Sequence, residues 1–126
     1  MSLHESAEMY LETIYTLSQS SAAVRSIDVA EALGYSRPSV SRAVGLLKKD
    51  SLLMTDKDGF LVLTEAGKAA AEKIYERHTV LTAALKALGV DAQTAAEDAC
   101  KIEHVISDRT LAAITKHMKQ FGQGTV

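Results

Sequence analysis

Apolar residues recur every three or four positions along most of the chain, which is the spacing of helices with one buried face. The first helix is expected to begin after Ser2, with Glu5 completing a capping box three residues later. Its buried face should consist of Tyr10, Ile14 and Leu17. The largely polar run at residues 18–24 is expected to end this helix.

Two short helices are predicted next, and each is marked by a capping residue. Ser26 should cap a helix over residues 27–33, which Gly34 should end because glycine readily adopts the left-handed conformation. Ser36 should cap the second helix, with Pro38 in its first turn, where the missing N–H of proline leaves no bond unmade. The buried stripe of this second helix is expected to be Val40, Val44 and Leu47.

Residues 52–63 predict a β-hairpin, because Asp58 and Gly59 form a turn signal between two short β-prone runs. A short helix, a turn at residues 34–36, a second helix and a hairpin follow one another in the order of a winged helix-turn-helix. The pattern therefore predicts a mainly α-helical protein with this DNA-binding motif in its first half.

The second half of the chain predicts longer helices. The expected caps are Thr64 for a helix ending at Gly89, Asp91 for one reaching about Ile106, and Ser107 for a last one closing near Gly122. Apolar faces on these helices comprise Leu81, Leu85, Leu88, Leu111, Ile114 and Met118. Since these faces exceed what a chain of 126 residues readily buries alone, they predict a homodimer.

Composition narrows the protein class. No apolar run is long enough for a membrane span, and the sequence does not begin with a basic and then apolar leader. One cysteine cannot close an internal disulfide, so we expect a cytoplasmic protein with no membrane partner. The net charge is −2, but residues 25–57 hold six basic and four acidic side chains, which weakly favours a phosphate-facing surface.

The second helix of the expected motif is suited to the major groove of double-stranded DNA. Its candidate base and phosphate contacts, with the hairpin-tip lysine, are Arg37, Pro38, Ser39, Ser41, Arg42 and Lys57. Short hydroxyl and guanidinium groups can bind bases and phosphates, and proline can contact a thymine methyl group. The alternative is that the arginines are only solvated and the helices only pack, but the hairpin in the expected place favours DNA binding.

A second candidate site lies near residues 100–104, which read CKIEH. In a helix, Cys100, Glu103 and His104 would share one face because they are spaced i, i+3 and i+4. Thiolate, carboxylate and imidazole together suit a borderline divalent metal ion. Met9 and Glu12 share a face of the first helix, and His78 should face inward on the long one. Taken singly, each of these residues is more often a core or solvated side chain.

Four stretches resemble one family in order and through nearly the whole chain: EMYLETIY (8–15), DVAEALGYSRPSVSRAV (28–44), LVLTEAGKAAAE (61–72) and CKIEHVISD (100–108). They are similar to the diphtheria-toxin-repressor family of metal-activated bacterial transcriptional repressors, which respond to iron or manganese. The resemblance implies a winged helix-turn-helix domain over residues 1–70 and a helical metal-binding and dimerisation domain over residues 71–126.

The resemblance also implies a primary metal site formed by Met9, Cys100, Glu103 and His104. Met and Cys at these positions resemble the iron-responsive members, and such soft ligands favour Fe²⁺, with Mn²⁺ as the alternative and Co²⁺, Ni²⁺ or Zn²⁺ as substitutes in vitro. Glu12 and His78 instead match the manganese-type pattern, in which a second ion lies beside the first. The iron-type ancillary positions hold Thr82 and Ala96, which are poor replacements for its ligands.

The function implied is a metal-dependent repressor that binds a palindromic operator as a homodimer and controls metal-uptake genes. An ion held by residues of the first helix and of the 100–104 segment would control DNA binding. We expect the short architecture of the family, without an SH3-like domain, and no enzymatic activity. One alternative is a winged-helix regulator that senses a small organic ligand, or thiol oxidation at Cys100. A metal-dependent hydrolase with Glu12 as its base is disfavoured, because no second acid-base pair accompanies it.

Overall fold

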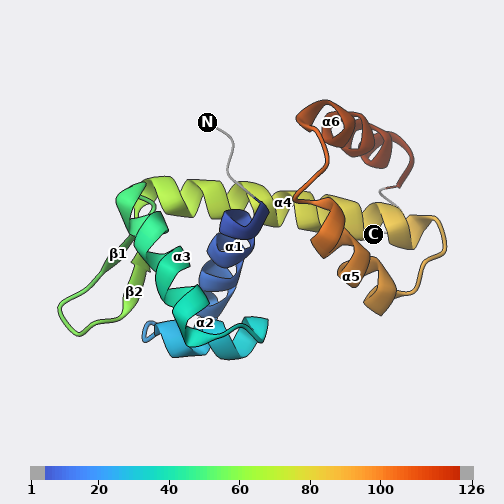
Figure 1. The fold of residues 1–126 in the computed structure, drawn as a ribbon. Coiled ribbons are helices and arrows are strands. Elements are labelled where there is room, and N and C mark those ends of the chain that lie inside the picture. Colours follow the sequence, from blue (N-terminus) through green and yellow to red (C-terminus); the bar gives the residue numbers. More distant parts are fainter. Residues whose placement is uncertain (1–4, 123–126) are drawn as a thin grey trace. The chain divides into compact units, whose positions relative to one another are not determined.

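The computed structural model describes residues 5–122 and is almost entirely helical apart from one hairpin (Figure 1). The chain divides after Glu72 into two compact units. We call residues 5–72 the N-terminal unit and residues 73–122 the C-terminal unit. The boundary falls within helix α4, which runs from Glu65 to Ala87. The mainly α-helical fold class expected from the sequence is confirmed.

The N-terminal unit contains three helices, a hairpin and the beginning of α4. The elements are α1 (Glu5–Ser20), α2 (Ser26–Leu33), α3 (Arg37–Lys49), β1 (Leu53–Thr55) and β2 (Leu61–Leu63). The buried core includes Tyr10, Leu11, Ile14, Val24, Val29, Val40, Val44, Leu47, Leu53 and Leu61. Leu17 is only half-buried, so the expected core face of the first helix holds for Tyr10 and Ile14 and omits Leu11.

The boundaries of α1 differ from the expectation. The proposed capping residue Ser2 lies outside the described residues. At its other end α1 continues through the first polar residues of the 18–24 run and stops at Ser20, because two serines and one glutamine, all exposed, do not prevent helical hydrogen bonding. The segment after α1 is hydrogen-bonded to strand β2, because the N–H of Leu61 donates to the carbonyl of Val24 at 2.7 Å.

The α2–turn–α3 segment is closed by local caps. Gly34 adopts φ 72°, and its N–H donates to the carbonyl of Ala30 at 2.8 Å, so the predicted glycine terminator is confirmed. Ser36 caps α3 by accepting from the N–H of Ser39, and Pro38 lies in the first turn as expected. Ser26 is not the cap of α2. The cap is Arg25, whose N–H donates to the side chain of Asp28 at 2.8 Å.

The hairpin forms where the sequence predicted it. Strands β1 and β2 pair antiparallel in the register Leu53↔Leu63, Met54↔Val62 and Thr55↔Leu61. The carboxylate of Asp56 accepts from the N–H groups of Asp58 and Phe60, and Gly59 takes φ 84° at the tip. A side chain that ties two N–H groups fixes a turn without help from the core. The hairpin tip is therefore a turn fixed by local hydrogen bonds, and it carries the exposed Lys57.

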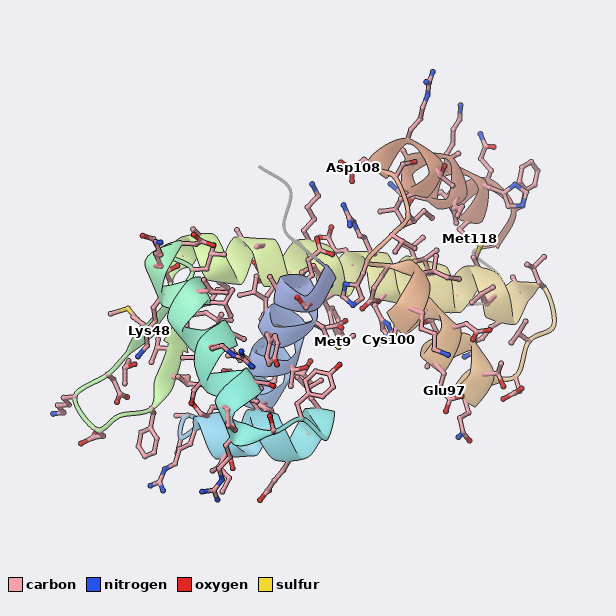
Figure 2. The ribbon with its side chains drawn as sticks, viewed as in Figure 1. Met9, Lys48, Glu97, Cys100, Asp108 and Met118 are labelled. Atoms are coloured by element: carbon pink, nitrogen blue, oxygen red, sulfur yellow. The ribbon has the colours of Figure 1, made fainter. Side chains whose placement is uncertain are left out.

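The C-terminal unit is formed by the remainder of α4, by α5 (Ala92–Ile102), by α6 (Asp108–His117) and by a π-helical turn (Met118–Gly122). The labelled Asp108 and Met118 mark the start of α6 and the residue just beyond its end (Figure 2). Asp91 and Ser107 cap α5 and α6 through the N–H groups of Thr94 and Thr110, as predicted. No helix among the described residues is long and apolar enough to cross a bilayer.

Helix α5 ends four residues earlier than the predicted Ile106. The N–H groups of Val105 and Ile106 both donate to the carbonyl of Ile102, which closes the chain into a turn. Glu103 is the C-cap of α5 and keeps right-handed helical geometry, with φ −59° and ψ −24°. The expected helix is thus shorter, although the helical spacing between Cys100 and Glu103 is retained because the N–H of Glu103 still donates to Ala99.

Candidate metal centre

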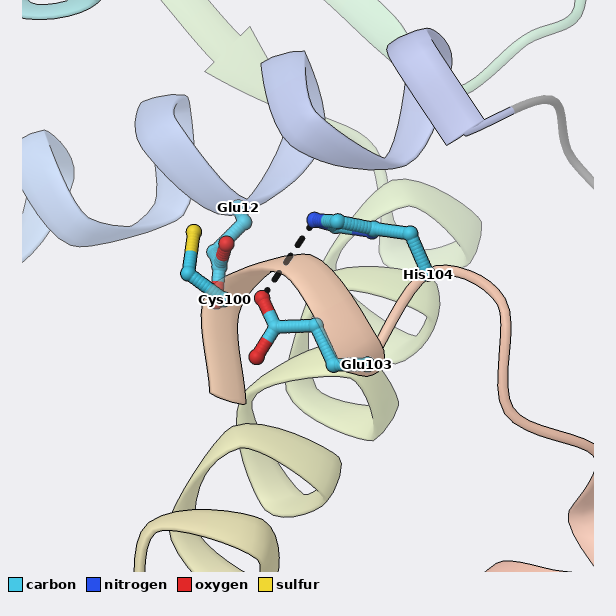
Figure 3. Close-up of side chains that lie close together, drawn as sticks. All are labelled: Glu12, Cys100, Glu103 and His104. Carbon is cyan, nitrogen blue, oxygen red and sulfur yellow. Dashed lines mark ion pairs between the residues drawn. The ribbon is translucent and has the colours of Figure 1, made fainter. Parts of the chain in front are cut away.

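The C-terminal unit brings together three of the predicted metal ligands at the end of α5 (Figure 3). One ligand atom from each of Cys100, Glu103 and His104 lies within 4.8 Å of the others. Cys100 comes from the last turn of α5, and the other two follow in the turn that ends this helix. The i, i+3, i+4 spacing therefore gathers a thiol, a carboxylate and an imidazole although the helix stops before the last two.

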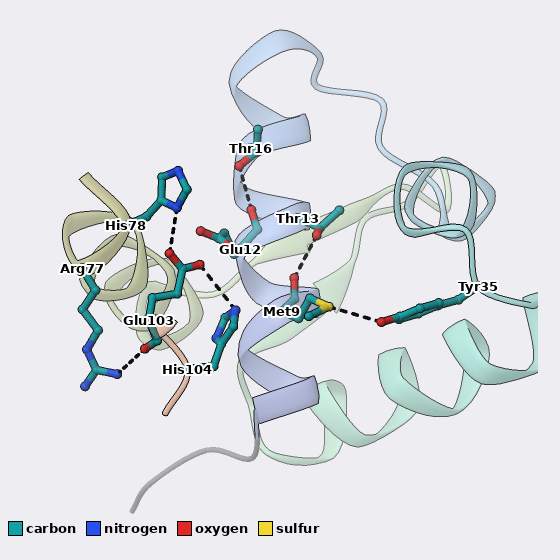
Figure 4. Close-up of polar contacts among 9 residues, drawn as sticks. All are labelled: Met9, Glu12, Thr13, Thr16, Tyr35, Arg77, His78, Glu103 and His104. Atoms are coloured by element: carbon teal, nitrogen blue, oxygen red, sulfur yellow. Dashed lines mark hydrogen bonds and ion pairs between the residues drawn. The ribbon is translucent and has the colours of Figure 1, made fainter. Parts of the chain in front are cut away.

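Glu103 is the centre of this cluster. Its side chain is fully buried, and the two carboxylate oxygens are directed to different imidazoles (Figure 4). His78 Nδ1 lies 2.8 Å from Oε2, and His104 Nε2 lies 3.4 Å from Oε1. A buried carboxylate is costly unless it is paired, and here nitrogen atoms from α4 and from the following residue surround it.

Arg77 supports the same turn from α4. Its Nη1 donates to the main-chain carbonyl of Glu103 at 3.2 Å, and its Nη2 donates to the carboxylate of Asp108 at 2.6 Å. The side chain of Arg77 is nearly buried, whereas Lys73, which lies 3.9 Å from Asp108, is largely exposed. The arginine therefore links the ligand-bearing turn to the first residue of α6. Sequence reasoning did not single out Arg77, because no local pattern marks a contact across 26 residues.

The donor chemistry of the cluster fits a divalent transition metal. A thiolate, a carboxylate oxygen and imidazole nitrogens are the ligands that Fe²⁺, Co²⁺ and Zn²⁺ bind in proteins. His78, predicted to face inward, is half-buried and contacts Glu103, which is consistent with a ligand or with a partner that orients one. Ala96 offers no donor atom, so an iron-type ancillary set is incomplete in this unit.

The remaining predicted ligands, Met9 and Glu12, belong to the N-terminal unit and lie one turn apart on α1. Both are half-buried. The sulfur of Met9 accepts a hydrogen bond from the hydroxyl of Tyr35 at 3.4 Å (Figure 4). Tyr35 was not predicted as a functional residue, since the sequence showed only that it lies in the turn between α2 and α3.

The predicted DNA-contacting residues lie on the N-terminal part of α3 and at the hairpin tip. Five of the six are exposed, namely Arg37, Pro38, Ser41, Arg42 and Lys57. Ser39 is half-buried, and its hydroxyl accepts from Ser36 at 2.9 Å, so it takes part in the helix cap. Arg25 lies over the ring of Phe60, at 5.2 Å from its centre, and adds a cation beside the hairpin that the sequence analysis did not identify.

Two family descriptions match consecutive parts of the chain. Residues 2–61 match "Iron dependent repressor, N-terminal DNA binding domain", and residues 64–123 match "Iron dependent repressor, metal binding and dimerisation domain". The chain belongs to the diphtheria-toxin-repressor family of iron-dependent repressors. This family consists of DNA-binding transcriptional repressors and not of enzymes. The family resemblance read from the sequence is thus confirmed.

Curated relatives and solved structures agree with this assignment. The chain is 31% identical over 120 residues to the diphtheria toxin repressor of Corynebacterium jeikeium, covering 94% of this chain and 50% of the relative. It is 29% identical to the manganese regulator SloR, with a TM-score of 0.79 over 94% of this chain and 55% of that one. A manganese-dependent transcriptional repressor in complex with manganese is 30% identical, with a TM-score of 0.83 over 90% and 52%. The chain spans about half the length of the curated relatives it matches.

Proposed function

We propose that this protein is a transcriptional repressor that binds palindromic operator DNA as a homodimer when it holds a divalent metal. The observation that carries the proposal is the buried Glu103 carboxylate between His78 and His104, beside Cys100, in a chain that also has a winged helix-turn-helix. Residues 1–70 would read DNA, and residues 71–126 would hold metal and form the dimer.

The proposed primary ligands are Cys100, Glu103 and His104 together with Met9, and Glu12 and His78 would serve a second, neighbouring ion. Sulfur donors are soft, so two of them in one ligand set favour Fe²⁺ over Mn²⁺. Carboxylates such as Glu12 are the harder ligands that Mn²⁺ prefers, which makes Mn²⁺ the next candidate. When bound, the metal supplies positive charge that holds carboxylate, thiolate and imidazole groups together.

Control of DNA binding would follow from the division of the ligands between the two units. Met9 and Glu12 belong to the N-terminal unit with the reading helix α3, and the other ligands belong to the C-terminal unit. Ligands from both units are satisfied together only in certain arrangements of the chain, so metal binding favours those arrangements over the others. The free-energy difference between these arrangements changes by as much as their free energies of metal binding differ.

Dimerisation through the C-terminal unit is supported by its uncovered apolar side chains. None of the described residues of α6 is buried, although Leu111 and Ile114 lie on it at helical spacing. Leu88 is 80% exposed at the end of α4, and Phe121 is 71% exposed in the π-helical turn. A second copy of the chain would cover such side chains, and twofold symmetry would present two reading helices to a palindromic site upstream of metal-uptake genes.

The proposal is tested by DNA binding titrated in parallel with Fe²⁺, under anaerobic conditions, and Mn²⁺. The DNA is a duplex selected from a random-sequence library with metal-loaded protein. Wild type should require less Fe²⁺ than Mn²⁺, and Cys100→Glu should reverse this order because a carboxylate replaces the thiolate. Cys100→Ala is the matched control, since it removes a ligand without adding one and should weaken the response to both metals.

Two outcomes would contradict the proposal. Duplex binding by wild type that is unchanged in excess chelator would mean that metal does not control the protein, and would favour the small-ligand or thiol-oxidation alternative. An unaltered metal preference in Cys100→Glu would show that Cys100 does not select the metal.

A further inference from the structure

Tyr35 joins the N-terminal part of α1 to the turn that precedes the reading helix. Its hydroxyl donates to the sulfur of Met9 at 3.4 Å (Figure 4). Its ring meets the ring of the neighbouring Tyr10 edge-on, with 6.0 Å between centroids and 62° between planes. Two adjacent residues of α1 therefore contact Tyr35: Met9 accepts its hydrogen bond, and Tyr10 packs against its ring.

The position of Tyr35 along the chain gives these contacts a consequence for α3. Gly34 ends α2 in the left-handed conformation, and Ser36 caps α3, so Tyr35 is the residue between the two helix-turn-helix caps. Its own N–H donates to the carbonyl of Ala30 at 3.2 Å, which ties its backbone to α2. The backbone of Tyr35 therefore lies two residues before Arg37, the first residue of the reading helix.

The hydrogen bond also changes the chemistry of the Met9 sulfur. A thioether is a weak hydrogen-bond acceptor, and the electron pairs that accept an O–H are the same pairs that bind a metal. A thioether sulfur has two such pairs, so an O–H donor occupies one of them and withdraws electron density from the other. The phenol therefore opposes the use of Met9 as a metal ligand, by about the net strength of one weak hydrogen bond.

We propose that Tyr35 is a positioning residue that competes with the metal for the Met9 sulfur and so sets the metal concentration at which the protein responds. The inference rests on the proposed function, since it takes Met9 to be a ligand. A metal ion that took the electron pair used by the O–H would displace the tyrosine hydroxyl from the sulfur, and Tyr35 directly precedes Ser36, the cap of α3, in the chain. Tyr35 thereby connects the ligand on α1 with the turn before the DNA-reading helix.

A double-mutant cycle between Tyr35→Phe and Met9→Leu tests the competition. Tyr35→Phe removes the hydroxyl and keeps the ring that meets Tyr10. Affinity is measured with Co²⁺ as the probe, through the absorption that a thiolate ligand such as Cys100 gives with cobalt. Tyr35→Phe should tighten Co²⁺ binding about two- to fivefold, which corresponds to the net strength of one weak hydrogen bond. This effect should appear only where Met9 is present. In the Met9→Leu background the same change should have no effect.

A second arm of the cycle needs no metal. In excess chelator, Tyr35→Phe should lower the urea midpoint of the wild-type chain and leave that of Met9→Leu unchanged, because the hydrogen bond exists only when both groups are present. Tyr75→Phe, at a half-exposed tyrosine of α4, is the matched control and should leave Co²⁺ affinity unaltered in both backgrounds.

The outcomes separate this inference from the proposed function. If wild type binds no Co²⁺, the proposed function fails. If wild type binds Co²⁺ but Tyr35→Phe weakens or does not change the affinity, only the competition is overturned. An equal effect of Tyr35→Phe in the Met9 and Met9→Leu backgrounds also overturns it, since a purely structural role of the tyrosine gives that result.

Discussion

The guanidinium of Arg77 donates a hydrogen bond to the main-chain carbonyl of Glu103, with 3.2 Å between Nη1 and the oxygen. The carbonyl belongs to the residue just beyond the last turn of α5, where helical carbonyls lack partners within the helix. The same guanidinium binds Asp108 at the start of α6. One side chain on α4 thus fixes the turn that carries Glu103 and His104 and also the entry to α6.

Replacing Arg77 by lysine should weaken metal binding. Lysine keeps the charge but cannot donate to Glu103 and Asp108 at once from a planar fork, so the ligand turn would be less well held. Residues that orient metal ligands typically contribute about tenfold or more to affinity, and we expect a loss of about tenfold for Arg77→Lys. Competition between a metal-indicator dye and the protein for Mn²⁺ measures this loss.

The control for this variant is Lys73→Ala. Lys73 is exposed and lies 3.9 Å from the same Asp108 carboxylate, and exposed pairs of this kind contribute little. Its removal should change metal affinity by less than about twofold. Equal losses for Lys73→Ala and Arg77→Lys would mean that charge near Asp108 matters and that the bond to Glu103 does not.

A second prediction concerns Gly67, in the first turn of α4. A Cβ atom built on Gly67 would overlap the main-chain carbonyl oxygen of Leu52, which itself accepts from the N–H of Thr64 at 3.2 Å. Backbone on both sides cannot move aside easily, so Gly67→Ala should destabilise the protein by about 2 kcal/mol or more. Urea denaturation followed by circular dichroism measures the change.

Gly45→Ala is the matched control, because Gly45 lies in the interior of α3 and an added Cβ would meet nothing within 4 Å beyond its chain neighbours and the adjacent backbone of its own helix. Alanine is the better helix former, so this variant should gain about 0.5–1 kcal/mol. If both alanine variants are stabilised, the close approach of α4 to Leu52 does not exist in solution.

A third prediction follows from the cap of α5. The N–H of Thr94 donates to the carboxylate of Asp91 at 3.0 Å and lowers the pKa of this carboxyl below its ordinary value. A lowered pKa in the folded state means stabilisation that is present above the unfolded pKa and is lost as the pH falls through the folded pKa. Wild type should therefore lose more stability on acidification than Asp91→Asn, whose amide oxygen still caps the helix.

Urea midpoints of the wild type and of Asp91→Asn, measured in steps from pH 7 to pH 3, check this prediction. The remaining acidic groups are common to both proteins and cancel in the comparison. The midpoints should be similar near neutrality and should diverge only below about pH 4, the ordinary range of an aspartate. A constant difference across the series would contradict the assigned cap.

The elements predictable from sequence are those fixed by neighbours in the chain. Ser36, Asp91 and Ser107 each bind an N–H three residues away, and Gly34 takes its left-handed conformation for local steric reasons. The early end of α5 carries no such signal, since the residue that ends it is Glu103 and not glycine or proline. Local signals therefore located the caps of α3, α5 and α6 but misplaced the cap of α2 and the ends of α1 and α5.

The candidate site was predictable only in part, for a related reason. The spacing of Cys100, Glu103 and His104 places their donors together along one segment. Arg77 with Glu103 and Tyr35 with Met9 are each separated by 26 residues, and such contacts depend on how whole helices pack. Periodicity does not encode them, so supporting residues around a site become visible only in the folded chain.

The last prediction addresses the reading helix. Arg42 is exposed on α3, six residues after the cap formed by Ser36, and we expect it to contact operator DNA. Arg42→Ala should weaken DNA binding of the metal-loaded protein and leave metal affinity unchanged. If Arg42 contacts a phosphate, its loss should also reduce the slope of log affinity against log salt by about one unit.

Lys48→Ala serves as the control. Lys48 is exposed in the last turn of α3, whereas the N-terminal part of this helix is the part expected in the groove. A larger loss for Lys48→Ala than for Arg42→Ala, in fluorescence anisotropy at several salt concentrations, would mean that the opposite end of α3 faces the duplex.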